Sequence, residues 1–579
     1  MSQASRHILM TVLGTNPQNA RYGLGDREAQ ARIAVLALLD LLPEDEKPDH
    51  VVALCTSEAR KETLPFLLQG LPHRYTLESV EIPAGHTQDD LDTFLTRAAE
   101  VVPEGPPVEL SVDVTHGYRH FSFLTYTAVL YLSALRGVPI RGFYYGLLRR
   151  DAVSPFLDLK PLLALPHWFH ALKVLDETGS ALPIAKLLGD GPQSPFSREI
   201  GHALTRLSAA YLSGLPVELG QQARRFCEQK SRPLTRLLQN EHHLPLAREL
   251  VGSLTNTLDR FRLPGPVDGH GWKRRVPLSK EELERQAHLI DALLQRENLA
   301  TALGLMDEWT VSWAAWCIGD EDHWLDYQRV RRRAANLLGA IAAVGKDPDL
   351  GPIATQEQRA LGAFWDLLCE LRNGYHHHGM RWKSLVGNRH HESQLEKVQR
   401  YWEETLRQVP KDIPLALRGA RVGRLLVSPI GRRPGVLFSA LQVARDEGDL
   451  APAHCLVICS PETETLIKEA MEQAQYAGPW KSLVLEDPYG GRTEIERVVK
   501  TARKTLVEAD EVLVNVTGGT TLLGLVAHEI AAEARRFARP VRRFGLIDRR
   551  RPEQQDKDPY QTGEAFWLDT KEGGDEQGD

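Results

Sequence analysis

The segment Val108–Gly117, with the sequence VELSVDVTHG, carries the pattern that decides the fold of the first part of the chain. A mostly apolar run ends at Asp113, and the turn Val114–Gly117 then leads into a helical stretch. A strand, a short turn and a helix in succession are typical of a parallel sheet covered by helices. Residues 1–160 are therefore predicted to form an α/β domain. Its other predicted strands are Ile8–Leu13, Val51–Cys55 and Ile140–Tyr145.

A second copy of this pattern lies about 400 residues later in the chain. The turn Asn515–Gly519 (NVTGG) corresponds to Asp113–Gly117 (DVTHG), and each follows a strand and precedes a helix. The segment Leu54–Glu58 (LCTSE) has a counterpart in Ile458–Glu462 (ICSPE), at a similar offset. The common order predicts two copies of one α/β domain, the second at residues 420–565. Its predicted strands are Leu425–Ile430, Cys455–Cys459, Glu511–Val516 and Val541–Ile547.

The segment between the two copies has a different pattern. From residue 161 to residue 410 helical periodicity dominates and strand signals disappear, as in Glu281–Met306 and Gln356–Leu371. The predicted fold class is therefore α/β plus all-α, with two Rossmann-like parallel sheets flanking a helical domain. Residues 566–579 are acidic and Gly-rich, and they are predicted to be a disordered tail.

Composition narrows the class of protein. The 579 residues are 42% hydrophobic and 25% charged, as in a soluble globular protein, and the net charge of -7 argues against a DNA-coating function. Six cysteines without a C-x-x-C pair are typical of a reduced, cytoplasmic protein. The longest apolar stretch, Phe121–Leu135, is shorter than the roughly 20 residues of a membrane span. It is predicted to be a buried helix, and no membrane partner is expected.

The repeated turns suit a phosphate-containing ligand. Ligands of open parallel sheets bind beyond the carboxyl ends of the strands, where both turns lie. Glycine lets backbone amides approach a phosphate, and the hydroxyls of Thr115, Thr517 and Thr520 are expected to donate to its oxygens. Neither turn matches the glycine patterns of NAD-binding or ATP-hydrolysing sites. The alternative is a tight turn with a helix cap, which needs the same residue types and no ligand.

The turns also resemble those of a known family. DVTHG reproduces the D-x-T-H-G signature of a CRISPR-associated family, and Gly14-Thr15-Asn16 resembles its first ligand loop. NVTGGT is similar to the corresponding turn of the wider CARF class of CRISPR-associated Rossmann-like sensors. The resemblance covers residues 7–150 and 422–550, although the second copy departs from it at Ser428-Pro429-Ile430-Gly431.

This resemblance implies that the chain binds a cyclic oligoadenylate made by a type III CRISPR complex, in a pocket shared by two such domains. The ligand-binding residues expected from it are Gly14, Thr15, Asn16, Thr56, Ser57, Thr115, His116, Gly117, Ser428, Ser460, Thr517, Gly518, Gly519 and Thr520.

One stretch of the helical region carries residues suited to cutting RNA. The sequence of Glu370–His378 is ELRNGYHHH, which contains the pattern R-N-x-x-x-H through Arg372, Asn373 and His377. Metal-free RNA cleavage requires deprotonation of a ribose 2'-hydroxyl, stabilisation of a charged phosphate and protonation of the leaving oxygen. Histidine titrates near neutral pH, and arginine offers a permanently charged fork of donors. The alternative interpretation is an exposed arginine near a solvated histidine without a catalytic role, which would match the same sequence pattern.

The spacing leaves the choice of histidine open. On an ideal helix His377 points about 140° away from Arg372, whereas His376 lies almost on the same face. Asn373 is expected to orient either partner. Glu370 or Asp366 is expected to support the site by holding the arginine in place.

The pattern is similar to that of the HEPN ribonucleases, whose active site combines one motif from each of two subunits. This resemblance implies Arg372, Asn373 and His377 as catalytic residues, with His376 as the substitute. A D-x-T-H-G domain followed by a helical domain resembles the CARF-HEPN ribonucleases. It implies a homodimer that cuts single-stranded RNA after a cyclic oligoadenylate binds and that leaves a 2',3'-cyclic phosphate, without a metal cofactor.

Other interpretations remain. Adjacent histidines on a helix point in different directions, and no H-E-x-x-H pairing occurs, so no metal site is predicted. Trp309, Trp313 and Trp316 have helical spacing and are predicted to pack in a core. A CARF-type transcription regulator, a nucleotide buffer and a ring nuclease that cleaves the cyclic ligand are the alternative functions. No DNA-binding pattern is evident, so DNA is not an expected partner.

Overall fold

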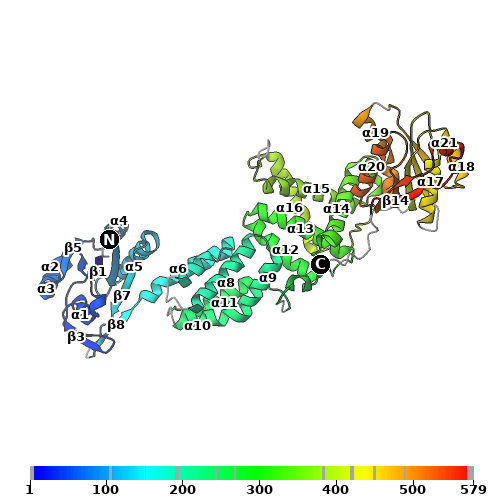
Figure 1. The fold of residues 1–579 in the computed structure, drawn as a ribbon. Coiled ribbons are helices and arrows are strands. Elements are labelled where there is room, and N and C mark those ends of the chain that lie inside the picture. The colour runs from blue at the N-terminus through cyan, green and yellow to red at the C-terminus, as the bar shows by residue number, and fades with distance from the viewer. Residues whose placement is uncertain are drawn as a thin grey trace. The chain divides into compact units, whose positions relative to one another are not determined.

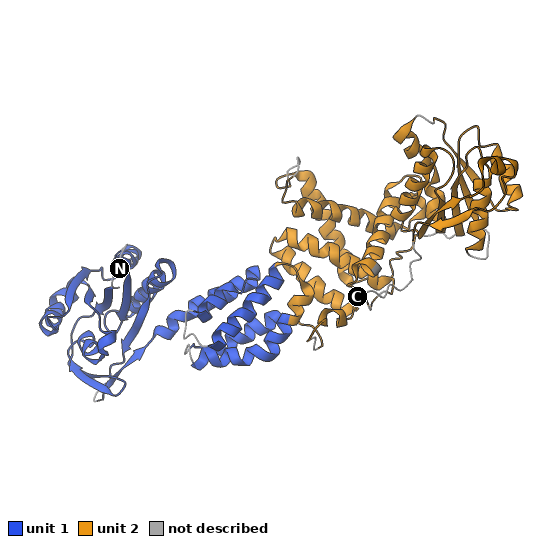
Figure 2. Ribbon diagram, viewed as in Figure 1, with its two compact units in different colours: residues 1–212, 222–260 blue, residues 213–221, 261–579 orange. Residues whose placement is uncertain are grey.

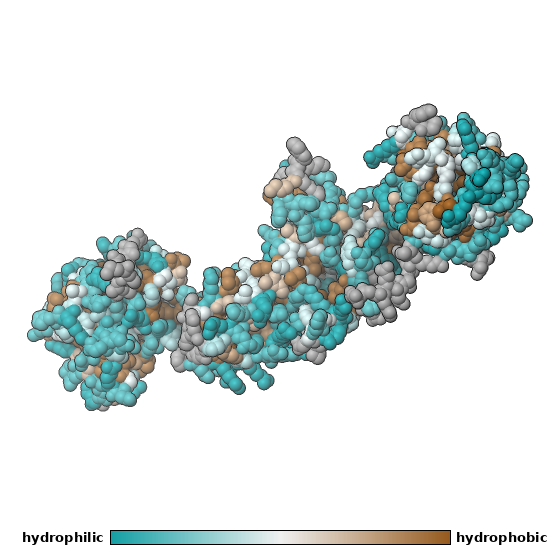
Figure 3. All heavy atoms as spheres, viewed as in Figure 1, coloured by the Kyte–Doolittle hydropathy of each residue, from teal (hydrophilic) through white to brown (hydrophobic). Residues whose placement is uncertain are grey.

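The structure is a computed structural model that describes residues 6–103, 107–149, 152–189, 195–240, 244–265, 269–319, 321, 323–380, 385–417, 423–447, 452–487 and 490–569. The chain forms two compact units (Figure 2). Unit 1 comprises Met1–Leu212 and Gln222–Arg260, and unit 2 comprises Ser213–Gln221 and Phe261–Asp579. Within the described residues, no helix combines the length and the apolarity that a membrane crossing requires. Figure 3 shows a mainly hydrophilic surface with hydrophobic residues scattered in small groups.

Unit 1 begins with an α/β part. Its strands are β1 (Arg6–Leu13), β2 (Ala20–Leu24), β3 (Arg27–Ala31), β4 (His50–Cys55), β5 (Thr76–Glu81), β6 (Val108–Asp113), β7 (Ile140–Gly146) and β8 (Ser154–Asp158). Its helices are α1 (Ala34–Leu41), α2 (Ser57–Glu62), α3 (Leu64–Gly70), α4 (Gln88–Glu100) and α5 (Arg119–Arg136), as labelled in Figure 1.

These strands form one sheet in the order β3-β2-β8-β7-β6-β1-β4-β5. β1 pairs in parallel with β4 on one side and with β6 on the other. β4 and β5 lie on one side of β1, whereas the later strands β6 and β7 lie on its other side, so the direction of winding reverses between β1 and β6. In parallel sheets this switch point is where loops separate and ligands bind.

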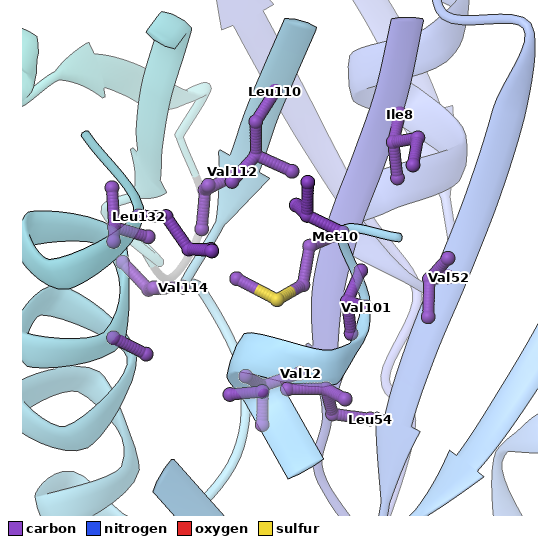
Figure 4. Close-up of a cluster of buried hydrophobic side chains, with 14 of the residues drawn as sticks. Ile8, Met10, Val12, Val52, Leu54, Val101, Leu110, Val112, Val114 and Leu132 are labelled. Carbon is purple, nitrogen blue, oxygen red and sulfur yellow. The ribbon is translucent and has the colours of Figure 1, made fainter. Parts of the chain in front are cut away.

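Alternate residues of β1 enter two cores, one on each face of the sheet. Ile8, Met10 and Val12 pack on the face covered by α4 and α5, together with apolar residues of β4 and β6 (Figure 4). Leu9 and Leu13 pack on the opposite face, under α1 and α3. A strand buried on both faces reads as a continuous apolar run, which explains why β1, β4 and β6 were evident in the sequence.

The helical segment follows. Its helices are α6 (Lys160–Thr178), α7 (Leu182–Gly189), α8 (Pro195–Leu212), α9 (Pro216–Arg225), α10 (Ser231–Asn240), α11 (Ala247–Asp259), α12 (Lys280–Gln295), α13 (Leu299–Cys317), α14 (Arg332–Lys346), α15 (Gln356–His376) and α16 (Arg389–Glu404). The segment belongs to both units, because α6–α8, α10 and α11 lie in unit 1 whereas α12–α16 lie in unit 2. In unit 2, α13, α14 and α15 pack against one another, and α16 packs on α15.

Unit 2 ends with a second α/β part. Its elements are β9 (Gly423–Pro429), α17 (Gly435–Asp446), β10 (His454–Cys459), α18 (Leu466–Gln473), β11 (Trp480–Val484), α19 (Gly491–Glu508), β12 (Ala509–Asn515), α20 (Thr521–Arg536), β13 (Val541–Ile547), α21 (Pro552–Lys557) and β14 (Glu564–Trp567). The sheet order is β11-β10-β9-β12-β13-β14. It reproduces the run β5-β4-β1-β6-β7-β8 of the first sheet, and in both six-strand runs only the last strand is antiparallel to its neighbour. The first sheet continues beyond this run with β2 and β3. The repeat predicted from the sequence is thus present in the strand order and direction.

The structure corrects the predicted elements in two places, the helix at Phe121–Leu135 and the start of the tail. The stretch Phe121–Leu135 is not buried on all sides, since Phe123 is 75% and Leu135 is 78% exposed on α5. The helical stretch Glu281–Met306 comprises parts of two helices, since α12 ends at Gln295 and α13 begins at Leu299. The predicted helical region 161–410 is divided between the two compact units.

The tail does not begin at residue 566, because Glu564–Trp567 form β14 and pair with β13. The carboxylate of Asp569 then binds the guanidinium group of Arg543 at 2.9 Å. Residues 570–579, the remainder of the predicted tail, lie outside the described residues.

Candidate functional site

The turn of the D-x-T-H-G segment is built around one fully buried carboxylate. Asp113 Oδ2 accepts a hydrogen bond of 2.8 Å from the Thr11 hydroxyl of the neighbouring strand β1. Asp113 Oδ1 accepts from the backbone N–H of Thr115 at 3.1 Å and from the Thr115 hydroxyl at 2.5 Å. An aspartate that bonds to the backbone two residues ahead forms a turn in its own right.

The second copy has the same construction with an amide. Asn515 Nδ2 donates to the Ser428 hydroxyl of β9 at 3.0 Å, and Asn515 Oδ1 accepts from the backbone N–H of Thr517 at 2.9 Å. Ser428 therefore occupies the place of Thr11. Its hydroxyl is buried in this contact, so the structure gives Ser428 a structural partner rather than an exposed edge position.

The threonine hydroxyls of both turns have partners within the sheet. Thr115 Oγ1 donates to Asp113 and accepts from the backbone N–H of Gly146 at 2.8 Å. Thr517 Oγ1 accepts from the backbone N–H of Leu546, also at 2.8 Å. These hydroxyls join the turn to the next strand, β7 or β13. The hydroxyl proton of Thr115 is directed at the Asp113 carboxylate in this structure.

Glycines bring two loops into contact at each switch point. A Cβ on Gly14, after β1, would lie 2.9 Å from the backbone nitrogen of Gly117, after β6. In the second copy a Cβ on Gly431 would lie 2.8 Å from the backbone of Gly519. Gly117 has φ +98° and Gly519 has φ +73°, which side chains disfavour. The glycines thus let the two loops of each switch point come into contact, and Gly117 and Gly519 are exposed there.

The other expected ligand residues divide into caps and exposed groups. The hydroxyls of Thr56 and Thr520 accept from backbone N–H groups in the first turns of α2 and α20. Ser460 contacts Thr463 through its backbone and its hydroxyl. The expected residues whose side chains or backbone are exposed at the two edges are Thr15, Asn16, Ser57, Gly117, Gly519 and Thr520.

His116 caps a helix. Its Nε2 accepts a hydrogen bond of 3.1 Å from the backbone N–H of Ala34, the first residue of α1, which has no side-chain cap of its own. A nitrogen that accepts must be unprotonated, so the neutral imidazole is the form that fits. Burial holds the pKa of His116 below its usual value of 6.5, and the negative charge of Asp113 opposes this effect only in part.

The stability of unit 1 should therefore depend on pH through His116. Its folded-state pKa is lowered, so this contribution is present above pH 6.5 and is lost as the pH falls through the folded-state value. In the variant His116→Gln the side-chain oxygen keeps the acceptor without titrating. We expect the free energy of opening of α1, measured by hydrogen exchange of its amides, to fall less between pH 7 and pH 5 in this variant than in the parent. An unchanged pH dependence would contradict this assignment.

The candidate catalytic residues lie at the carboxyl end of α15. This helix begins with a capping box between Thr355 and Gln358 and buries Leu361, Leu368 and Leu371 against its neighbours. Its last turn presents Arg372 and His376, four residues apart, toward α13. Arg372 Nη2 lies 3.2 Å from Asp307 Oδ2 of α13. His376 lies against the same helix, because a Cβ on Gly304 would be 2.9 Å from His376 Nε2.

A cavity of about 720 Å³ opens beside this helix pair. Arg372, Tyr375, His376 and His378 line it from the end of α15, and Asp307 lines it from α13. Other cavity residues form ion pairs, Lys273 with Glu218 and Arg331 with Glu308. Every arginine and lysine that lines the cavity therefore has a carboxylate partner among the described residues.

The three histidines have different surroundings. His376, the last residue of α15, and His378, which has φ +51°, line the cavity. His377 ends the helix as its C-cap, with its backbone N–H donating to Asn373 at 3.1 Å, and its exposed side chain is not part of the cavity lining. Asn373 Oδ1 accepts from Arg372 Nη1 at 2.9 Å, so Asn373 and Arg372 are in contact as expected.

The expected support of Arg372 comes from another residue. Asp366 pairs with Lys346 of α14, and Glu370 accepts from Gln394 of α16 at 3.3 Å. Sequence reasoning missed Asp307, which lies 65 residues before Arg372. Burial raises the pKa of Asp307, and the neighbouring Arg372 opposes this effect. Burial also raises the pKa of Cys369, whose thiol lies 3.6 Å from Asp307 Oδ1, to about 12.

The predictions about metals and tryptophans can be compared with the structure directly. Within the described ranges, no group of three or more His, Cys, Asp or Glu side chains is arranged to hold a metal ion. Trp309, Trp313 and Trp316 are buried, which confirms that they pack in a core. The indole of Trp309 donates to the backbone of Leu283, and that of Trp313 donates to the backbone of Pro410.

Neither a protein-family model nor the sequence of a curated protein matches the chain. Among solved structures, the chain is similar to Enterococcus italicus Csm6 bound to cyclic hexa-2'-fluoro-hexa-dAMP, with 11% sequence identity and a TM-score of 0.35. The similarity covers 70% of this chain and 94% of that chain. At these values the similarity does not assign the chain to a family.

Proposed function

We propose that this protein is a metal-independent endoribonuclease of type III CRISPR defence that cuts single-stranded RNA when a cyclic oligoadenylate binds its α/β parts. The proposal rests on the D-x-T-H-G turn, its repeat, and the R-N-x-x-x-H pattern in the helical segment. The observation that carries it is the end of α15. There the Arg372 guanidinium, held at 3.2 Å by Asp307, lines a cavity together with His376 and His378, and the exposed His377 ends the helix beside them.

The chemistry follows from these groups. A neutral histidine removes the proton of a ribose 2'-hydroxyl, and the resulting oxygen attacks the adjacent phosphorus. Arg372 stabilises the charge on the phosphate oxygens as the P–O5' bond breaks. A protonated histidine then gives its proton to the leaving 5'-oxygen. The products are a 2',3'-cyclic phosphate and a 5'-hydroxyl, and no metal is required.

The site is completed in a homodimer. Each chain has one R-N-x-x-x-H pattern, whereas the reaction needs a base and an acid. Two copies of Arg372 and His377 across a dimer interface supply both. The exposed position of His377 at the end of α15 suits a group that acts on a neighbouring subunit. A cyclic oligoadenylate activates the enzyme by binding more tightly to the arrangement in which the two copies meet.

Gly304 separates the roles of the two histidines. In Gly304→Ala the new methyl group would lie 2.9 Å from His376 Nε2, so this imidazole must move while His377 keeps its surroundings. With His377 as the catalytic histidine we expect less than about a threefold change in the rate of RNA cleavage, because an exposed terminal side chain moves aside at little cost. A loss of tenfold or more would instead assign the reaction to His376. The rate is measured with saturating ligand.

The proposal as a whole is tested by one assay. Fluorescent single-stranded RNA is incubated with the full chain in EDTA, with and without cyclic tetra- or hexa-adenylate. We expect cleavage that depends on one of these ligands, and products with 2',3'-cyclic phosphate ends by mass spectrometry. Intact RNA with every ligand would overturn the proposal, and chromatography of the ligand would then distinguish a ring nuclease from a nucleotide buffer.

A further inference from the structure

We infer that Asp307 is the positioning residue of the nuclease site: it fixes the orientation of the Arg372 guanidinium from a separate helix. This inference rests on the proposed function and deepens it. It adds a residue of α13, a helix without a recognisable motif, to the site that the R-N-x-x-x-H pattern of α15 defines.

The contacts of Asp307 leave its carboxylate little freedom. Its Oδ2 accepts from Arg372 Nη2 at 3.2 Å, and its Oδ1 accepts from the Cys369 thiol at 3.6 Å. Asp307 is 9% exposed, whereas the Arg372 side chain is 34% exposed. The pair therefore has a buried, anchored member and a member that reaches the cavity.

Arg372 has the contacts expected of a guanidinium that is aimed by its neighbours. Nη2 binds Asp307, and Nη1 binds Asn373 Oδ1 at 2.9 Å. Its buried Nε has no hydrogen-bond partner among the described residues. Two of the three nitrogens are thus fixed from different directions, and the arginine retains unused donor capacity. Such an arrangement sets the plane of the group before a phosphate arrives.

The surroundings of Asp307 also explain why an acid is present in an apolar helix. α13 is largely buried, with Leu303, Met306 and Trp309 inside the core. A buried carboxylate is costly unless it is paired, and Arg372 is the cation that it meets. Removing the charge of Asp307 would leave Arg372 without its anchor, although the helix packing would persist.

The experiment compares Asp307→Asn, Asp307→Glu and Asp291→Asn in the full chain. Asp291 is a suitable control because it also pairs with an arginine, Arg407, at 2.5 Å in the same helical region but does not line the cavity. We expect kcat for RNA cleavage to fall by about 10- to 100-fold in Asp307→Asn, because small displacements of catalytic groups lower rates by this much. KM should change less than threefold, Asp307→Glu should recover part of the rate, and Asp291→Asn should match the parent.

The outcomes separate this inference from the proposed function. If the parent cuts RNA and Asp307→Asn cuts it with an unchanged kcat, the positioning role is refuted and the nuclease assignment stands. If the rate falls equally in Asp291→Asn, the effect is one of general stability, which also refutes the inference. If the parent cuts no RNA with any ligand, the proposed function fails and this inference fails with it.

Discussion

Replacing Arg372 with alanine is expected to lower the rate of ligand-activated RNA cleavage by about 10³-fold, since a preorganised donor to transition-state charge is worth that much. His377→Ala should have a comparable effect, because the proposal assigns the proton transfers at the phosphate to this residue. Both rates are measured with saturating cyclic oligoadenylate. Affinity for the ligand, measured by calorimetry, should be unchanged, because neither residue belongs to the α/β parts to which the proposal assigns the ligand.

Arg400→Ala is the matched control for this experiment. Arg400 is exposed on α16, which packs against α15, and it does not line the cavity. Its removal also takes one positive charge from the helical segment. A parental rate in Arg400→Ala with a large loss in Arg372→Ala would separate catalysis from general attraction of RNA. Retained cleavage in both Arg372→Ala and His377→Ala would defeat the assignment of the site.

Asp113→Ala is expected to destabilise unit 1 by about 3 kcal/mol, because the buried hydroxyl of Thr11 and the N–H of Thr115 would lose their acceptor. Asp113→Asn should cost under about 1 kcal/mol. The second α/β part already has an asparagine at this position, since Asn515 forms the corresponding hydrogen bonds with Ser428 and Thr517.

Native-state hydrogen exchange of the β1 and β6 amides measures this difference within the full chain. The comparison isolates the hydrogen bonds from the change in charge, because both variants lose the carboxylate. Equal destabilisation of the two variants would show that the charge of Asp113, and not its role as an acceptor, is what the turn requires.

The sequence was most informative where strands are buried on both faces. All eight predicted strands occur, with ends displaced by at most two residues, as in β9 (Gly423–Pro429) against Leu425–Ile430. The strands that were missed are β2, β3, β5, β8, β11 and β14. They lie at or near sheet edges and carry polar residues on exposed faces, as in β5 (TLESVE). One-sided burial leaves too weak an apolar signal for detection in a single sequence.

The candidate site was only half visible in the sequence. Arg372, Asn373 and the histidines fall within nine residues, so their spacing could be read directly. Asp307 is distant in sequence, and only the packing of α13 against α15 brings the two together. One signal was present, namely an acid in the apolar run of α13, LATALGLMDEWTVSWAAWC. A charge in such a helix requires a partner, but the sequence does not say which arginine provides it.

The internal bonding of the two repeated turns changes how mutagenesis of this protein should be interpreted. Truncation of Thr115, Thr517 or Asn515 would remove hydrogen bonds inside the sheet, so a loss of ligand binding in such variants would not by itself identify a ligand contact. Under the proposed function, the main-chain amides at these edges and the exposed groups around them are the better places to test for ligand contacts. Alanine scanning of the signature motif would therefore report on the hydrogen bonds that hold the turn. Bulky substitutions at the exposed Thr15 or Asn16 would test whether a ligand binds beside them.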